Sequence, residues 1–398
     1  MVLDSLHAAE GNKIVTTCGD SVRCTILSKD TIIMDLVIAE LSDIYVKQCS
    51  IVLDCIINQG NITGILNSRF SVFNRLGMKD YLSSIGLKSK IELLKLTHGV
   101  SLSDCLWVRF DGENLDWKDV NPYCTSHVFD INWLIDKGNP LLNIVIPNYS
   151  SSGQFAKCWY TDNNVHKLIK CGSSGAYNAG IEPVSEVLFT QIADALKFNN
   201  YVKYDFHYVD YTGTNYVYRQ PSMLREVVGS TQKRLATVCE CFAGESGALI
   251  TAKELGLSSY KDCIDFAKKH TLNHIDVANI LLCDCVGFNE DRHFGNIGFL
   301  YNPDTMEIIS VAPMYDNNLS LLCYWDDRDN VDDYVLELCA KDGSAFDKLA
   351  ELVFDEYPVL YHKLKAANIT LSSPVVRNDR VDMLNEVVHK NINKLLLV

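Results

Sequence analysis

Apolar and polar side chains alternate in short runs over the first fifty residues of the chain, at 14–18, 24–27 and 31–37. A period of two residues is typical of strands that bury one face. Between residues 70 and 96 the apolar spacing becomes mixed and partly helical. We therefore expect helix to follow this first set of strands.

A second β-rich stretch begins near residue 150. The turn sequence Asp162-Asn163-Asn164 separates two apolar runs, which predicts a hairpin. Apolar steps of four residues predict a helix at 185–198, and strands are predicted at 155–160, 165–170, 201–209 and 235–242. Beyond these the spacing is helical, over 253–255, 260–269, 275–285 and 381–397. The pattern therefore predicts an α+β fold in which a β-rich half precedes a helix-rich half.

Length and composition fit a globular protein of two or three domains. The chain has 398 residues, 47% of them apolar, with 19 Tyr, 15 Phe and 5 Trp. This is too apolar and too aromatic for a disordered chain. The sequence has no 20–50-residue repeat and no long Pro/Gly/Ser linker, so we expect the domains to be joined tightly.

The charge balance argues against one broad class of function. With 36 basic and 50 acidic residues the net charge is −14, the wrong sign for a general nucleic-acid-binding surface, although a local basic groove stays open. No apolar stretch reaches membrane-spanning length, and the first residues lack the order of a secretory signal. Fifteen Cys without a C-x-x-C pair indicate reduced thiols. We therefore expect a cytoplasmic protein without nucleic-acid or membrane partners.

The residues with the clearest chemical pattern are Asp291, Asn296 and Asp316. Phosphoryl transfer needs one carboxylate that takes the proton of the acceptor hydroxyl, and an amide and a second carboxylate that hold Mg²⁺ against nucleotide phosphates. In protein kinases the first two are spaced D-x-x-x-x-N, as Asp291 and Asn296 are. That spacing alone is common by chance. The predicted helix–loop–hairpin context and the second Asp after the hairpin make it specific enough to predict a phosphotransferase site.

Five stretches resemble known kinases. Residues 291–296 (DRHFGN) resemble the catalytic loop shared by phosphatidylinositol 3- and 4-kinases and bacterial HipA-like serine/threonine kinases, and residues 312–317 (APMYDN) resemble their metal-binding segment. Upstream, 101–107, 117–121 and 151–159 are similar to the bacterial branch. The resemblance extends from about residue 40 to beyond 330 and is strongest over 288–322.

The resemblance implies a bilobal, protein-kinase-like fold of the phosphatidylinositol-kinase/HipA-like type. An accessory region at 1–140 would precede a β-rich N-lobe at 141–243 and a helical C-lobe at 244–398. The implied activity is that of a serine/threonine protein kinase that uses ATP and Mg²⁺. Its partners would be a protein substrate with a Ser or Thr acceptor and a regulatory or antitoxin-like protein.

The resemblance also assigns roles in the C-lobe. Asp291 would be the catalytic base, and Asn296 and Asp316 would bind Mg²⁺. His293 would support the catalytic loop or steady charge on the phosphoryl group.

In the N-lobe, the phosphate-covering loop would include Ser151, Ser152 and Gly153, where glycine permits close backbone approach. Autophosphorylation of the two serines would add negative charge beside ATP and oppose its binding. The phosphate-binding lysine would be Lys170, with Lys157 and Lys167 as alternatives. Its partner would be Glu186, unless that side chain lies in solvent on a polar helix stripe. The hinge that contacts adenine is expected at Glu240, Cys241 and Phe242.

Three questions stay open at this level. The acidic run at 326–333 follows the metal-binding Asp where kinases place their substrate segment, but such runs are usually solvated loops. The acceptor could instead be a phosphoinositide or another small molecule, which the acidic charge disfavours. The chain could also be a nucleotide-binding pseudokinase that acts as an interaction module.

Overall fold

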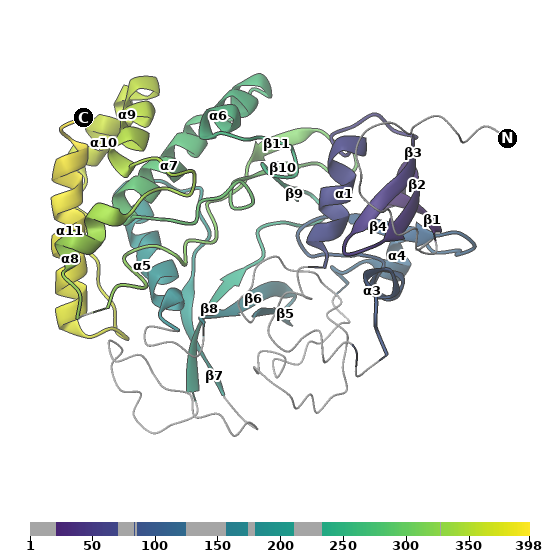
Figure 1. Cartoon of the computed structure of the whole chain (residues 1–398), viewed down its shortest axis with the longest axis horizontal. Helices are drawn as coiled ribbons and strands as arrows, with labels where there is room; N and C mark the ends of the chain where they lie inside the picture. The colour runs from purple at the N-terminus through teal and green to yellow at the C-terminus, as the bar shows by residue number, and fades with distance from the viewer. Residues whose placement is uncertain are drawn as a thin grey trace, which may run out of the picture.

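The computed structural model describes residues 21–70, 83, 86–124, 157–173, 180–210, 233–326 and 328–398. Within these ranges the chain forms three antiparallel sheets and a set of helices, so the predicted α+β class is confirmed. Figure 1 shows the N-terminal sheet at one end of the molecule and helices α6 to α11 at the other, with the remaining strands between them. The predicted strand at 14–18 lies outside the described residues.

The N-terminal sheet has the strand order β3-β2-β1-β4. Its strands are β1 (Val22–Ser28), β2 (Thr31–Glu40), β3 (Ile44–Ile51) and β4 (Leu106–Phe110). Helices α1 (Gln59–Ser68) and α3 (Lys90–Thr97) pack on it, and each begins at a capping box. Side-chain burial alternates along β1 as the pleat of a strand requires: Cys24 and Ile26 are buried, whereas Thr25 between them is not.

The second sheet has the order β5-β6-β8-β7 and carries α5 (Glu182–Ala195) against it. Its strands are β5 (Lys157–Asp162), β6 (Val165–Cys171), β7 (Asp205–Asp210) and β8 (Lys233–Glu240). The predicted hairpin is present, with Asn163 and Asn164 at positive φ as a tight two-residue turn requires. The predicted strand at 201–209 begins later, because Tyr201 instead bridges to Met314.

The third sheet, β11-β10-β9, lies beside the helical part of the chain. Its strands are β9 (Ala248–Thr251), β10 (Gly298–Tyr301) and β11 (Ile308–Val311). The helices are α6 (Tyr260–Lys269), α7 (Ile275–Gly287), α8 (Val331–Glu337), α9 (Phe346–Glu356), α10 (Pro358–Ala366) and α11 (Asn378–Leu395). The predicted helical stretch at 253–255 is a turn between β9 and α6.

Helix α7 is the centre of the helical part, since its residues from Val277 to Gly287 are all buried. It packs against α5, α6, α9 and α11. Gly287 is required at its end, because a Cβ there would lie 2.4 Å from the ring of Phe189 on α5. Within the described ranges, no helix has both the length and the apolar character needed to cross a membrane.

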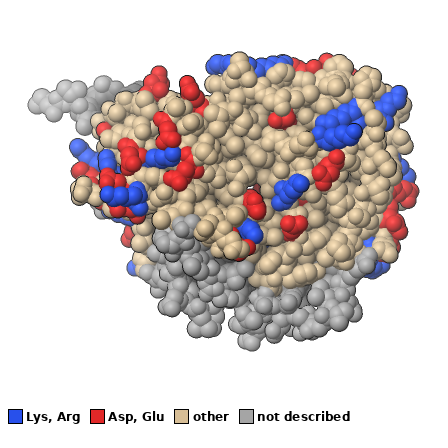
Figure 2. All heavy atoms as spheres, turned by 180° about the vertical axis from the view of Figure 1, so that it is seen from behind, with Lys and Arg blue, Asp and Glu red and all other residues tan. Residues whose placement is uncertain are grey.

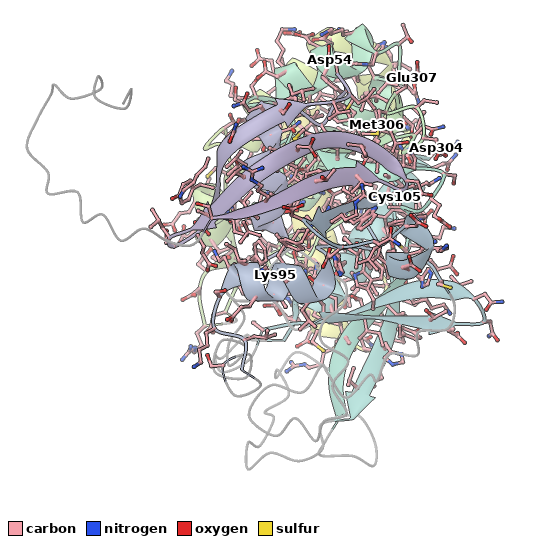
Figure 3. The ribbon with its side chains drawn as sticks, turned by 90° about the vertical axis from the view of Figure 1, so that its right-hand side faces the viewer. Asp54, Lys95, Cys105, Asp304, Met306 and Glu307 are labelled. Carbon is pink, nitrogen blue, oxygen red and sulfur yellow. The ribbon has the colours of Figure 1, made fainter. Side chains whose placement is uncertain are left out.

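Polar contacts join the N-terminal sheet to the rest of the chain. Ser28 Oγ donates to the carbonyl of Pro303 at 2.7 Å, and Lys29 Nζ lies 2.8 Å from Asp304 Oδ2. Figure 3 labels Asp304 beside Cys105, whose carbonyl accepts from the Lys29 amide. A further helical turn, α4 (Trp117–Val120), contributes Trp117, whose indole N–H donates to Glu245 at 2.9 Å.

Candidate active site

Strand β6 carries a buried lysine toward helix α5. Strand alternation turns Lys170 inward, where it is 5% exposed, and its Nζ lies 3.1 Å from Glu186 Oε1. Glu186 is fully buried, and its other oxygen accepts from Thr237 Oγ1 on β8 at 3.3 Å. The two residues that the resemblance pairs therefore meet, and the solvent-facing alternative for Glu186 is excluded.

The same ammonium group also forms an ion pair with Asp316. Burial alone would lower the pKa of Lys170, but the carboxylates of Asp316 and Glu186 raise it above its usual value. Burial opposes ionisation of Asp316, yet Lys170, Lys157 and Arg292 hold its pKa below the usual range. Asp316 is therefore ionised at neutral pH and 26% exposed, as a metal-binding carboxylate must be.

The two other candidate lysines occupy different environments. Lys157 on β5 lies directly opposite Lys170 in the strand register, and its charge also reaches Asp316 and Glu186. Lys167 points to the opposite face of β6, where its Nζ lies 2.9 Å from Asp162 Oδ2. The structure thus groups Lys157 and Lys170 with the carboxylates and separates Lys167 from them.

The loop after α7 presents Asp291 and Asn296. Phe288 ends the helix in the left-handed conformation, and Asn289 Oδ1 accepts from the Asp291 amide at 3.1 Å. Asn296 Nδ2 donates to the Asp291 carbonyl at 3.1 Å, which closes the loop on itself. The Asp291 side chain is 22% exposed and available to a substrate. His293 is exposed, and its Nδ1 accepts from the Gly295 amide at 3.0 Å, a loop-supporting contact.

One buried arginine ties this loop to the segment of Asp316. Arg292 Nη1 donates to two carbonyl groups, that of Asn296 at 3.0 Å and that of Tyr315 at 2.6 Å. Its Nη2 donates to Asn317 Oδ1 at 2.5 Å. Because one nitrogen holds the carbonyls of residues 296 and 315, Asn296 and Asp316 lie on adjacent backbone segments.

Sequence reasoning missed the partner that holds Arg292 in place. Asp284 on α7 accepts from Arg292 Nε at 2.9 Å and from Nη2 at 3.0 Å, and both side chains are 1% exposed. Asp284 also accepts from Asn289 Nδ2 at 2.8 Å. An Asp within the apolar run Ile280–Gly287 of α7 was the available signal, because a buried carboxylate needs a cationic partner.

A second missed residue is Glu182, at the start of α5 and 1% exposed. Its Oε2 accepts from the amides of Ser173 and Gly180, both at 3.1 Å, and its Oε1 accepts from Tyr324 Oη at 3.1 Å. A Cβ on Gly172 would lie 2.4 Å from Glu182 Oε2, so glycine is required there. Glu182 therefore links the ends of the 173–180 segment to the stretch that follows Asp316.

The oxygen donors at this site fit a magnesium ion. Asn296 uses its Nδ2 within the loop, which leaves Oδ1 as the acceptor, and Asp316 supplies an ionised carboxylate. Among the described residues no group of three or more His, Cys, Asp or Glu could hold a metal by itself. Two oxygen ligands suit Mg²⁺, which is usually bound by one or two side chains together with substrate phosphates and water.

Other predicted contacts lie partly outside the described residues. Ser151, Ser152 and Gly153 fall in a range that the structure does not describe. In the expected hinge, Glu240 is exposed and the Cys241 amide already donates to the His166 carbonyl at 2.8 Å. Phe242 packs against Tyr315, with ring centroids 5.3 Å apart, so the hinge contacts the segment of Asp316.

The acidic run has local structural roles. Asn330 precedes α8 and caps it by accepting from the amides of Asp332 and Asp333, whose carboxylates favour a helix N-terminus. Asp326 pairs with Arg328. Figure 2 shows acidic and basic side chains interspersed across one face of the molecule. The helix cap and the Asp326–Arg328 ion pair favour a solvated segment.

Replacing Lys170 should affect both stability and nucleotide binding. Lys170→Met leaves Glu186 buried without its cation, so we expect the free energy of unfolding to fall by about 1–3 kcal/mol. Nucleotide affinity should fall about tenfold or more, measured by titration with a fluorescent ATP analogue. Lys167→Met is the matched control on the opposite face of the same strand and should change neither quantity. Equal effects of the two variants would contradict this assignment.

Comparisons with known proteins give little further information. No family model matches this sequence, and no curated protein matches it. Among solved structures, the Helicobacter pylori proinflammatory kinase CtkA is 15% identical, with a TM-score of 0.38, over 62% of this chain and 90% of that one. Two structures of the Golgi casein kinase, one with Mn/ADP bound, are 9% and 10% identical, with TM-scores of 0.33 and 0.32. They cover 62% of this chain and 70% and 71% of theirs. At TM-scores this low, the function has to be inferred from the site.

Proposed function

We propose that the protein is an ATP- and Mg²⁺-dependent serine/threonine protein kinase of the HipA-like type. The observation that carries this proposal is the set of contacts around Lys170. One buried lysine joins Glu186 and Asp316, and Arg292 joins the segment of Asp316 to the loop that presents Asp291 and Asn296. These are the residue types, in the arrangement, that phosphoryl transfer requires.

The proposal divides the chain into two lobes around this site. Residues 141–243 would form the N-lobe, which supplies Lys170 and Glu186. Residues 244–398 would form the C-lobe, which supplies Asp291, Asn296 and Asp316. Residues 1–140 would form the accessory region, of which Trp117 and Asn121 both donate to Glu245, beside the proposed connection between the lobes. A regulatory or antitoxin-like partner would act from outside these elements.

In the reaction, Asp291 accepts the proton of the acceptor hydroxyl as its oxygen attacks the γ-phosphorus of ATP and the bond to the β-phosphate oxygen breaks. Lys170 binds phosphate oxygens once the nucleotide competes for its ammonium group, and Glu186 keeps that group in place. Asn296 and Asp316 would hold Mg²⁺, which neutralises phosphate charge. Lys157, opposite Lys170, is a second cation for the phosphates.

A serine or threonine hydroxyl of a protein is the acceptor we favour. Phosphoinositide kinases need a basic surface toward anionic headgroups, whereas this chain has a net charge of −14. The capped acidic segment at 326–333 follows Asp316 and would repel such headgroups. A basic or neutral protein segment is a better match for this charge.

The experiment is phosphoryl transfer from γ-labelled ATP with Mg²⁺. The purified chain is incubated alone, with a mixture of peptides that contain Ser or Thr, and with phosphatidylinositol vesicles. Label on the chain or on peptides supports the proposal, and label on lipid alone replaces it with a lipid kinase. Nucleotide binding without transfer in any arm would identify a pseudokinase, and absence of nucleotide binding would refute the proposed function entirely.

A further inference from the structure

Lys341 contacts the proposed base from a part of the chain that the sequence patterns did not single out. Its Nζ lies 2.7 Å from Asp291 Oδ1, with side-chain exposures of 50% for Lys341 and 22% for Asp291. An ion pair that is this open to solvent adds little to folding stability. Its location on the proposed base therefore points to a role in the reaction.

The turn that carries Lys341 is well defined. It lies between α8 and α9, where the Ala340 amide donates to the Ser344 carbonyl and the Gly343 amide to the Ala340 carbonyl, each at 2.8 Å. Gly343 has φ +85°, a conformation that glycine adopts without strain. Ala340 itself is buried, so the backbone on one side of Lys341 is fixed.

This turn is packed against the loop of Asp291. Helix α9 begins at Phe346, two residues after Ser344. The ring of Phe346 packs edge to face against the ring of Phe288, with centroids 5.8 Å apart. Phe288 ends α7 immediately before the loop. Both residues are buried. The backbone on either side of the Lys341–Asp291 contact is therefore held by the hydrophobic core.

We propose that Lys341 is a positioning residue for phosphoryl transfer, which fixes the carboxylate of Asp291 in the orientation that receives the acceptor hydroxyl. The inference rests on the proposed function. With Oδ1 held by the ammonium group, Oδ2 is the oxygen that accepts the proton. Lys341 also offsets the charge of Asp291 and of the neighbouring Glu290, so an approaching phosphate group meets less repulsion.

The test compares Lys341→Met, Lys341→Arg and wild type in the transfer assay. We expect Lys341→Met to lower kcat about 10- to 100-fold, as loss of a charge-assisted hydrogen bond at a reacting group does. Its affinity for a fluorescent ATP analogue should stay within about threefold, and its unfolding midpoint within about 3 °C of wild type. Lys341→Arg should recover most of kcat. Lys348→Met, which removes an exposed lysine paired with Glu351 on α9, is the control.

A double variant separates positioning from a general structural effect. If Lys341 acts through Asp291, adding Lys341→Met to Asp291→Ala should lower residual turnover no further than Asp291→Ala alone. Additive losses would overturn the inference, as would unchanged kcat in Lys341→Met. A higher kcat would overturn it in favour of a contact that blocks the base. Failure of the proposed function is distinguishable, because wild type itself would then transfer no phosphate.

Discussion

Asp291→Ala should lower turnover by about 10²- to 10⁴-fold, the usual contribution of a general base, while it leaves nucleotide affinity within about threefold of wild type. The reason is that Asp291 forms its ion pair with Lys341, whereas Lys170, Glu186 and Asp316 pair with one another. The measurement is initial-rate transfer of labelled phosphate beside a nucleotide titration.

Asp355→Ala provides the control for this experiment, since it removes an exposed Asp of α9. It should leave both turnover and affinity unchanged. Folding should be preserved in Asp291→Ala, because the ion pair it removes is partly exposed and contributes about 1 kcal/mol or less. A fully active Asp291→Ala variant would mean that another group takes the proton and that the site has been assigned wrongly.

The sequence predicted local elements well where one periodicity dominated. The hairpin at 162–164 and the helices at 260–269 and 275–285 follow directly from turn chemistry and apolar spacing. The prediction failed where tertiary contacts replaced local ones. Tyr201 has strand-like neighbours, yet it bridges to Met314 and brings the segment of Asp316 toward the second sheet.

The candidate site shows the same division. Spacing was enough to single out Asp291, Asn296 and Asp316 as candidates, because phosphoryl transfer needs these residue types and protein kinases space the first two as D-x-x-x-x-N. Spacing did not distinguish Lys170 from Lys157, since both lie on one sheet face and only the register places them opposite each other. It also gave no sign of Lys341, which reaches the loop from 50 residues along the chain through packing of α9 on α7.

The largest expected effect on stability is that of Arg292→Met, with a loss of about 3–5 kcal/mol in the free energy of unfolding. Removal of the guanidinium leaves the Asp284 carboxylate buried without a cation. It also removes the donor of three further acceptors, the carbonyls of Asn296 and Tyr315 and the Asn317 Oδ1. Chemical denaturation followed by circular dichroism measures the loss. Arg328→Met, which removes an arginine whose side chain is 73% exposed, should cost about 1 kcal/mol or less.

The pH dependence of the loss identifies its cause. Burial raises the pKa of Asp284 and Arg292 opposes that rise, so the pKa of this carboxyl should increase further in Arg292→Met. A carboxyl whose pKa is higher in the folded than in the unfolded state favours the folded state at low pH, where it is protonated. This contribution is complete below the unfolded pKa of about 4 and is lost as the pH rises through the folded pKa. Arg292→Met should therefore be less destabilised near pH 5 than near pH 8.

The double variant Asp284→Asn/Arg292→Met should recover part of the stability at pH 8, because no unpaired charge remains. Equal losses at both pH values, with no recovery in the double variant, would show that the carbonyl contacts of Arg292 matter more than its charge.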